Sequence, residues 1–140
     1  MEPENETRGN QVVMVVDDEP YICRFFERVL GDEGYKVVST TSGRRALALA
    51  PEIRPNLVLM DIVMPDMDGV ATLRGLRSGG YQGPVIMVTG KGTIQTAREA
   101  MVLDAYQYIT KPFDLEFVRS VIREVFRVHA ERQKEIACAL

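Results

Sequence analysis

The sequence predicts an α/β fold in which a five-stranded parallel sheet carries helices on both faces. Short apolar runs, typical of strands buried on both faces, alternate along the chain with segments whose apolar residues recur every three or four positions. The loops between them are short, and strict alternation of this kind indicates parallel strands joined through helices. A chain of 140 residues suits one domain with a single core.

The composition excludes several functional classes. The net charge of -3 provides no basic footprint, so this domain is not expected to bind nucleic acid directly. No apolar run approaches the roughly 18 residues of a membrane span, which argues against a membrane protein. Residues 1–10 lack the apolar core of a signal peptide and are expected to form a flexible tail. Cys23 and Cys138 show no disulfide-framework spacing, which favours a reducing, cytoplasmic setting.

The N-terminal half contains the first two predicted strands and helices. Residues 11–16 form an apolar run that predicts the first buried strand. Pro20 opens an amphipathic helix that is stopped by Gly31 and Gly34. Residues 36–41 are rich in β-branched side chains and predict a second strand, after which Ser42 is expected to cap the next helix.

The middle of the chain carries the most informative segment. Residues 57–60 are an unbroken apolar run, and the strand that they predict ends in a carboxylate, Asp61. Residues 64–69 (Met-Pro-Asp-Met-Asp-Gly) interrupt the pattern, and Asp68 is a suitable N-cap for a third helix, which stops at residues 79–80. A charge at the end of a buried strand is costly unless it meets a cation or hydrogen-bond donors, so Asp61 is a candidate functional residue.

The fourth predicted strand ends in a hydroxyl, that of Thr89, and the fifth is followed by the amine of Lys111. Residues 85–88 predict a fourth buried strand that ends in Thr89, and Thr93 starts the fourth helix. Residues 105–109 predict a shorter and more polar fifth strand. Asp114 is placed to cap the last helix.

The predicted sheet brings five functional side chains to one edge. Asp17 and Asp18 follow the first strand, Asp61 the third, and Lys111 the fifth, while Thr89 ends the fourth. The carboxyl ends of parallel strands share an edge, and ligands bind there. Clustered carboxylates repel one another, and a hard divalent cation such as Mg²⁺ offsets that repulsion. Thr89 and Lys111 suit the oxygens of a phosphoryl group that Asp61 could accept as a mixed anhydride.

These residues resemble the receiver domain of bacterial two-component response regulators. The resemblance implies a flavodoxin-like three-layer αβα sandwich with strand order 2-1-3-4-5. It covers residues 11–126, leaving residues 1–10 as a tail and residues 127–140 as a helix extension or the start of a linker. The matching segments are Asp17-Asp18, Asp61 with residues 64–69 behind it, Thr89-Gly90, and residues 108–113 (Tyr-Ile-Thr-Lys-Pro-Phe).

The resemblance also implies the role of each site residue. Asp61 would accept a phosphoryl group from a histidine kinase or phosphotransfer protein, and Thr89 and Lys111 would contact the phosphoryl oxygens. The domain would not be an enzyme, but would assist its own phosphotransfer and its slow autodephosphorylation. The Mg²⁺ ligands would be Asp18 and Asp61 directly, Asp17 through water, and the backbone carbonyl of Val63.

The resemblance further implies a conformational switch and an output partner. Thr89 would move toward the phosphoryl group, and the ring of Tyr108 would turn inward behind it. The surface formed by the fourth helix, fifth strand and fifth helix would then change for a downstream effector domain or protein. The family pattern implies a cis bond between Lys111 and Pro112. The last helices could also support a homodimer. We expect the chain to be part of a longer regulator, with a stand-alone receiver as the alternative.

Two other functions compete with the phosphoacceptor. A Mg²⁺-dependent phosphohydrolase would commonly carry a second acid two residues after the nucleophile, where this chain has Val63. A phosphorylation-independent interaction module on the same fold would be favoured if an acid or the lysine were missing, and none is. Gly90 to Thr93 lacks the spacing of a phosphate-binding P-loop. The only histidine, His129, is expected to be a surface residue.

Overall fold

The computed structural model describes residues 10–139, and within this range it contains five strands and five helices. The strands pair in parallel in the order β2-β1-β3-β4-β5, so the predicted α/β fold and strand order are confirmed. Residues 1–9 of the predicted tail and the side chain of Cys138 lie outside the described residues. The elements are β1 (Val12–Val16), α2 (Pro20–Asp32), β2 (Lys36–Thr40), α3 (Gly43–Ile53), β3 (Leu57–Met60), α4 (Gly69–Ser78), β4 (Val85–Thr89), α5 (Ile94–Val102), β5 (Gln107–Thr110) and α6 (Leu115–Ala139).

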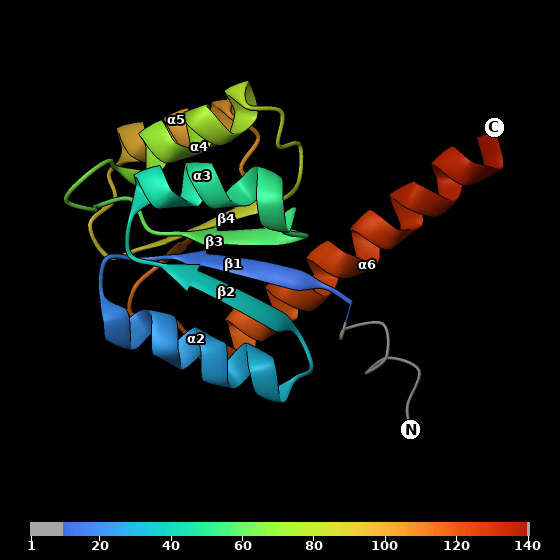
Figure 1. Ribbon diagram of the computed structural model, residues 1–140, viewed down its shortest axis with the longest axis horizontal. Coiled ribbons are helices and arrows are strands. Elements are labelled where there is room, and N and C mark those ends of the chain that lie inside the picture. The colour runs from blue at the N-terminus through green and yellow to red at the C-terminus, as the bar shows by residue number, and fades with distance from the viewer. Residues whose placement is uncertain (1–9, 140) are drawn as a thin grey trace. The chain divides into compact units, whose positions relative to one another are not determined.

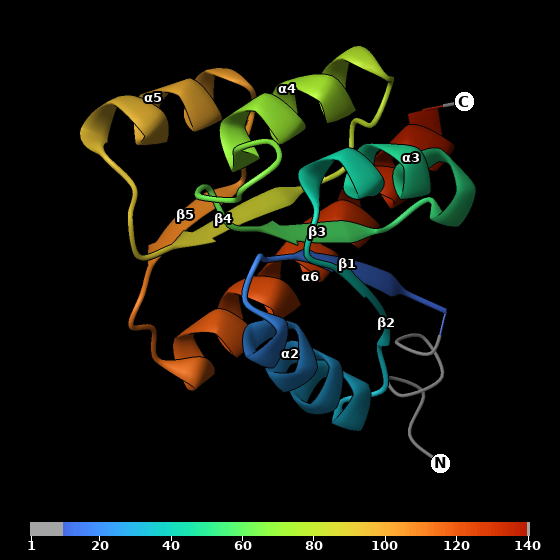
Figure 2. The same ribbon diagram turned by 60° about the vertical axis from the view of Figure 1, so that its left-hand side comes forward.

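The chain divides into two compact units, Met1–Thr110 and Lys111–Leu140. In the first unit, α2 covers one face of the sheet, and α3, α4 and α5 cover the other (Figures 1 and 2). The second unit contains α6, a helix of 25 residues. No helix in the described part of the chain is long and apolar enough to cross a membrane.

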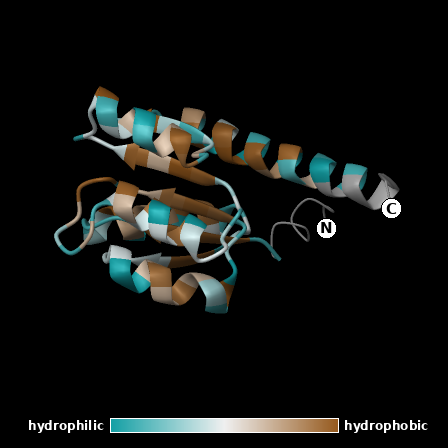
Figure 3. Ribbon diagram, turned by 90° about the horizontal axis from the view of Figure 1, so that it is seen from above, coloured by the Kyte–Doolittle hydropathy of each residue, from teal (hydrophilic) through white to brown (hydrophobic). Residues whose placement is uncertain are grey.

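The central strands are buried along nearly their whole length. Every residue of β3 and β4 is buried, and so is every residue of β1 after Val12. These strands are mostly brown, the colour of hydrophobic residues, in Figure 3. Parallel strands covered on both faces need such continuous apolar sequences, because both sides of each strand pack against helices. The sheet is therefore a rigid base for the residues that follow its strands.

Side-chain caps start four of the helices where the sequence predicts them, and at α6 the cap is Asp114, which accepts a hydrogen bond from the N–H of Glu116 at 2.9 Å. The hydroxyl of Ser42 accepts a hydrogen bond from the backbone N–H of Arg45, 3.1 Å away, at the start of α3. Asp68 accepts one from Ala71 at 2.8 Å at the start of α4. Thr93 caps α5 in the same way and forms a reciprocal capping box with Thr96. Each cap provides a partner for an N–H group that the helix itself leaves unpaired.

The fifth strand differs from the prediction by two residues at its start. It begins at Gln107 instead of Ala105 and ends at Thr110. The N–H of Ala105 donates to the carbonyl of Ala100 at 3.0 Å, so Ala105 closes the end of α5 and does not join the sheet. Asp104 just before it has a left-handed φ of 62°, which turns the chain toward the strand. The apolar pattern of residues 105–109 gave no sign of this turn.

Arg77 on α4 forms hydrogen bonds with two loops that are distant in sequence, the one after α4 and the one after α5. Its Nη1 donates to the carbonyls of Tyr81 and Gly83, both at 2.8 Å. Its Nε and Nη2 donate to the carbonyls of Leu103 at 2.9 Å and Asp104 at 3.1 Å. Partial burial lowers the pKa of this guanidinium from its usual value. The planar, multidentate group is suited to this task because it presents several donors in fixed directions.

Candidate functional site

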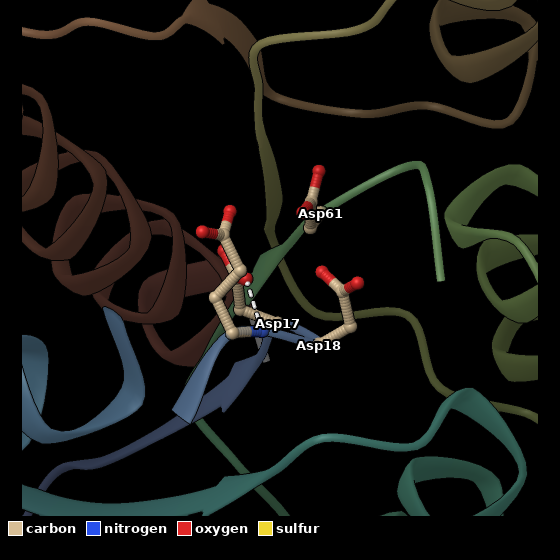
Figure 4. A group of neighbouring side chains, drawn as sticks. Asp17, Asp18 and Asp61 are labelled. Atoms are coloured by element: carbon tan, nitrogen blue, oxygen red, sulfur yellow. Dashed lines mark hydrogen bonds between the residues drawn. The ribbon is translucent and has the colours of Figure 1, made fainter. Parts of the chain in front are cut away.

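Four carboxylates gather at the carboxyl edge of the sheet. Asp17, Asp18 and Glu19 follow β1 and Asp61 follows β3, and each group offers an oxygen within 4.8 Å of the others. Figure 4 shows the side chains of Asp17, Asp18 and Asp61 around one common space. The sequence predicted these three but did not identify Glu19 as a fourth member. The signal that could have identified Glu19 is its position directly after Asp17 and Asp18.

The register between strands brings these acids together. Val16 pairs with Met60 at the end of the β1–β3 ladder. One residue farther, the N–H of Asp61 donates to the carbonyl of Val16 at 2.8 Å. On the other side of β1, the N–H of Asp17 donates to the carbonyl of Thr40 at 3.2 Å. Backbone hydrogen bonds therefore continue past the strand ends and fix the acidic residues on adjacent strands.

The backbone at the start of the following loop holds the side chain of Asp61 in place. Its side chain is 6% exposed, and its Oδ1 accepts a hydrogen bond from the N–H of Ile62 at 2.7 Å. The N–H of Gly69 donates to the carbonyl of Ile62 at 2.6 Å, so the loop returns to its starting point. A Cβ at Gly69 would lie 2.0 Å from the backbone oxygen of Asp61. This close return therefore requires glycine at position 69.

The same loop is also joined to the start of α3. Asp66 accepts hydrogen bonds from the hydroxyl of Ser42 at 2.7 Å and from the N–H groups of Gly43 at 3.3 Å and Arg44 at 3.1 Å. The hydrogen bond from Ser42, followed by those from the backbone, lowers the pKa of Asp66 to about 2. Sequence reasoning did not find this contact, because the two residues are far apart in the chain.

A buried thiol supports the acidic residues that follow β1. Cys23 on α2 is 5% exposed, and its Sγ donates to the backbone carbonyl of Asp17 at 3.3 Å. Burial, and then the nearby charge of Asp17, raise the pKa of the Cys23 thiol. The N–H of Glu19 donates to Oδ1 of Asp17 at 3.0 Å, which fixes that carboxylate against the first turn of α2.

The predicted hydroxyl and switch residues lie on the last two strands of the sheet. Thr89 ends β4 and is 1% exposed, and its Oγ1 accepts a hydrogen bond from the N–H of Lys91 at 3.3 Å. Tyr108 lies in β5 opposite Met87 of β4. Val63, two residues after Asp61, exposes 42% of its surface to solvent.

Lys111 begins the second unit, so its contact with a phosphoryl group on Asp61 stays a prediction. The peptide bond between Lys111 and Pro112 is cis, as the family resemblance implied. His129 lies within α6 and is partly exposed.

The donor set fits a hard divalent cation. Four carboxylates lie together, and two of them, Asp17 and Asp61, are almost fully buried. Like charges at this separation destabilise one another unless a cation is present. Carboxylate oxygens are the ligands that Mg²⁺ prefers, whereas the nitrogen or sulfur ligands favoured by zinc and copper do not enter this described cluster.

Comparisons with known proteins agree with this geometry. A profile described as the response regulator receiver domain matches residues 13–123. Regulatory protein AtoC of Escherichia coli is 34% identical over 122 residues, which cover 87% of this chain and 26% of AtoC. The chain thus spans about a quarter of that relative. It spans about half of two further relatives, which are named probable transcriptional regulatory protein TcrX of Mycobacterium tuberculosis and uncharacterized transcriptional regulatory protein YkoG of Bacillus subtilis.

A solved receiver structure has the same fold. The BeF3-activated N-terminal receiver domain of RstA from Klebsiella pneumoniae has a TM-score of 0.77 and 28% sequence identity. The match covers 84% of this chain and 99% of that one.

Proposed function

Because the chain belongs to the response regulator receiver domain family of two-component systems, we propose that Asp61 accepts a phosphoryl group from the histidine of a kinase or phosphotransfer protein. The observation that supports this assignment is the position of Asp61. It lies at the end of a central buried strand, within 4.8 Å of three other carboxylates. Among the four acids, Asp61 alone follows β3, and it faces the acids that follow β1.

The transfer needs one nucleophile and one leaving group. A carboxylate oxygen of Asp61 bonds to phosphorus while the bond from phosphorus to the imidazole nitrogen of the donor breaks. The imidazole leaves as the free histidine side chain and takes up a proton, and the product is an acyl phosphate. Water later attacks the phosphorus, and the carboxylate of Asp61 and inorganic phosphate are released.

The acids after β1 prepare the site for this chemistry. Asp17, Asp18 and Asp61 would hold Mg²⁺ with the backbone carbonyl of Val63, and the bound ion would supply positive charge against the carboxylates and the phosphoryl oxygens. The hydroxyl of Thr89 would donate a hydrogen bond to one phosphoryl oxygen, and the ammonium of Lys111 would pair with another.

The proposed output is a change of surface. The movement of Thr89 toward the phosphoryl group would favour the inward position of the Tyr108 ring and would alter the surface of α5, β5 and α6. The partner would be the effector domain of a longer cytoplasmic regulator or a separate effector protein. Homodimerisation through the last helices would be one form of this output. The transcriptional regulators among the relatives support an effector of that class.

Acetyl phosphate and Mg²⁺ provide a direct test with the purified chain. We expect mass spectrometry to show one base-labile phosphoryl adduct, and peptide mapping to locate it on Asp61. Asp61→Asn should abolish the adduct. Asp68→Asn is the matched control, because asparagine also caps a helix and the change lies in the same loop.

The absence of an adduct on the wild-type chain would instead favour a phosphorylation-independent interaction module. Continuous release of phosphate from small phosphate esters would favour the phosphohydrolase.

A further inference from the structure

The hydroxyl of Tyr108 lies directly against the backbone of Gly92. A Cβ built on Gly92 would lie 1.5 Å from the Tyr108 Oη and 2.8 Å from its Cζ. It would also lie 2.9 Å from Cγ2 of Thr89. The tip of the tyrosine ring therefore occupies the space that any other side chain at position 92 would fill.

Glycine is not needed at position 92 for its backbone conformation. Among the described glycines, those with positive φ are Gly34 and Gly80. Gly92 thus has a backbone that alanine can adopt, and the obstacle to alanine is the ring of Tyr108. An alanine at this position would be tolerated if the ring pointed elsewhere.

Tyr108 is partly buried, and the burial of its hydroxyl carries a cost. The Tyr108 Oη is buried and has no hydrogen-bond partner among the described residues. A buried hydroxyl without a hydrogen-bond partner shifts the equilibrium between its buried and exposed positions by about fivefold to 150-fold toward the exposed one. Packing of the apolar part of the ring works in the opposite direction.

We propose that Gly92 admits Tyr108 to this buried position and that the unpartnered hydroxyl limits how strongly the position is favoured. Together the two residues set the balance between buried and exposed Tyr108 before any phosphoryl transfer. Gly92 lies directly before Thr93, the N-cap of α5, so the ring packs against the connection that leads into that helix. The position of the ring can be tested without phosphorylation, whereas its consequence for signalling rests on the proposed function.

The first experiment reads the position of the ring in the unphosphorylated chain. The chain contains five tyrosines, so the protein is labelled with 3-fluorotyrosine and the Tyr108 signal is assigned by its loss in Tyr108→Phe. A soluble paramagnetic chelate then reports exposure through ¹⁹F relaxation. We expect Gly92→Ala to increase the relaxation of the Tyr108 signal several-fold. Gly31→Ala, where a Cβ would meet nothing within 4 Å, is the control that should leave it unchanged.

A double-mutant cycle covers the case in which the ring cannot leave. Gly92→Ala would then lower the urea midpoint of the chain with Tyr108 in place and have no such effect in the Tyr108→Ala background. The inference is overturned if Gly92→Ala leaves the ring protected and its effect on the urea midpoint is the same in both backgrounds.

Acetyl phosphate labelling separates this inference from the proposed function. Removal of the hydroxyl in Tyr108→Phe should favour the buried ring by about tenfold, and faster labelling than in the wild type is expected. The Gly92→Ala chain should be labelled more slowly than the wild type. If no variant is labelled but the ring responds as expected, the proposed function fails and the assignment of Gly92 stands. If labelling occurs while the ring does not respond to Gly92→Ala, only the inference fails.

Discussion

The carboxylate of Asp66 accepts a hydrogen bond of 2.7 Å from the hydroxyl of Ser42, and this pair joins the loop after Asp61 to the start of α3. Asp66 also accepts the N–H groups of Gly43 and Arg44. The N-terminus of a helix has unpaired donors and the positive end of the helix dipole, so a carboxylate is favourable there. A single acid therefore stabilises one helix and fixes a loop of the candidate site.

The Asp66 contact should make the protein sensitive to acid. Its pKa falls from 3.8 to about 2 on folding, so its contribution to stability is present above about pH 4 and is lost as the pH falls toward 2. Asp66→Asn should lower the urea midpoint at pH 7 and have a smaller effect at pH 2.5. Asp32→Asn, at an exposed position, controls for the change in charge. An equal effect of Asp66→Asn at both pH values would contradict this prediction.

Gly69→Ala should destabilise the chain, because the new Cβ would meet the backbone oxygen of Asp61 at 2.0 Å. Overpacking of this kind costs about 1–3 kcal/mol in the free energy of unfolding. Gly31→Ala is the matched control in α2, where the same substitution should stabilise the protein by about 0.4–1 kcal/mol. Chemical denaturation measures both values, and a neutral Gly69→Ala would show that the loop can move away from Asp61.

Arg77→Lys should lower the free energy of unfolding even though it keeps the charge. A lysine has one ammonium and cannot reach the four carbonyls that the guanidinium contacts. The expected loss is about 2–4 kcal/mol, from charged hydrogen bonds that are only partly buried. Arg74→Lys, exposed on the same helix, should have little effect. Equal stability of the two variants in urea would show that the Arg77 contacts contribute little.

Glu19 should contribute to cation binding although sequence reasoning assigned it no role. Removal of one negative charge from the cluster in Glu19→Gln is expected to weaken Mg²⁺ binding by about threefold to tenfold. Asp18→Asn should weaken it more, because Asp18 is a proposed direct ligand. Calorimetric titration with Mg²⁺ gives both affinities, and Glu52→Gln on α3 is the control. Unchanged binding in Glu19→Gln would exclude Glu19 from the site.

Val63→Asn should shorten the life of the acyl phosphate several-fold. The amide can hydrogen-bond a water molecule that attacks the phosphorus, whereas valine cannot, and the side chain at this position reaches solvent. Loss of the label after removal of acetyl phosphate measures the rate. Val63→Ile, which stays apolar, should keep the slow rate of the parent. A Val63→Asn variant that keeps its label as long as the parent would disprove the explanation.

Local patterns predicted most of the fold because burial and capping depend on neighbouring residues. The apolar run 57–60 coincides with β3, and Ser42, Asp68 and Thr93 cap helices as expected. The predicted start of β5 was wrong, because the N–H of Ala105 donates to the end of α5 and does not join the strand.

The parts of the site that the sequence did not predict depend on contacts between distant residues. The bond between Asp66 and Ser42 spans 24 positions, and the contact of Tyr108 with Gly92 joins a strand to a loop. No local pattern encodes such pairs. The three predicted acids were found because parallel strands necessarily share a carboxyl edge.

The site depends on the pairing of Val16 with Met60. Insertions that disturb this register are therefore less well tolerated than insertions at the amino edge of the sheet. One extra residue inside β1 or β3 would reverse which side chains face each side of the sheet and would separate Asp17 from Asp61. Extra residues at 79–84, on the opposite edge, would leave that register unchanged. An insertion there would instead separate Arg77 from the carbonyls of Tyr81 and Gly83, so it would lower stability without moving Asp17 away from Asp61.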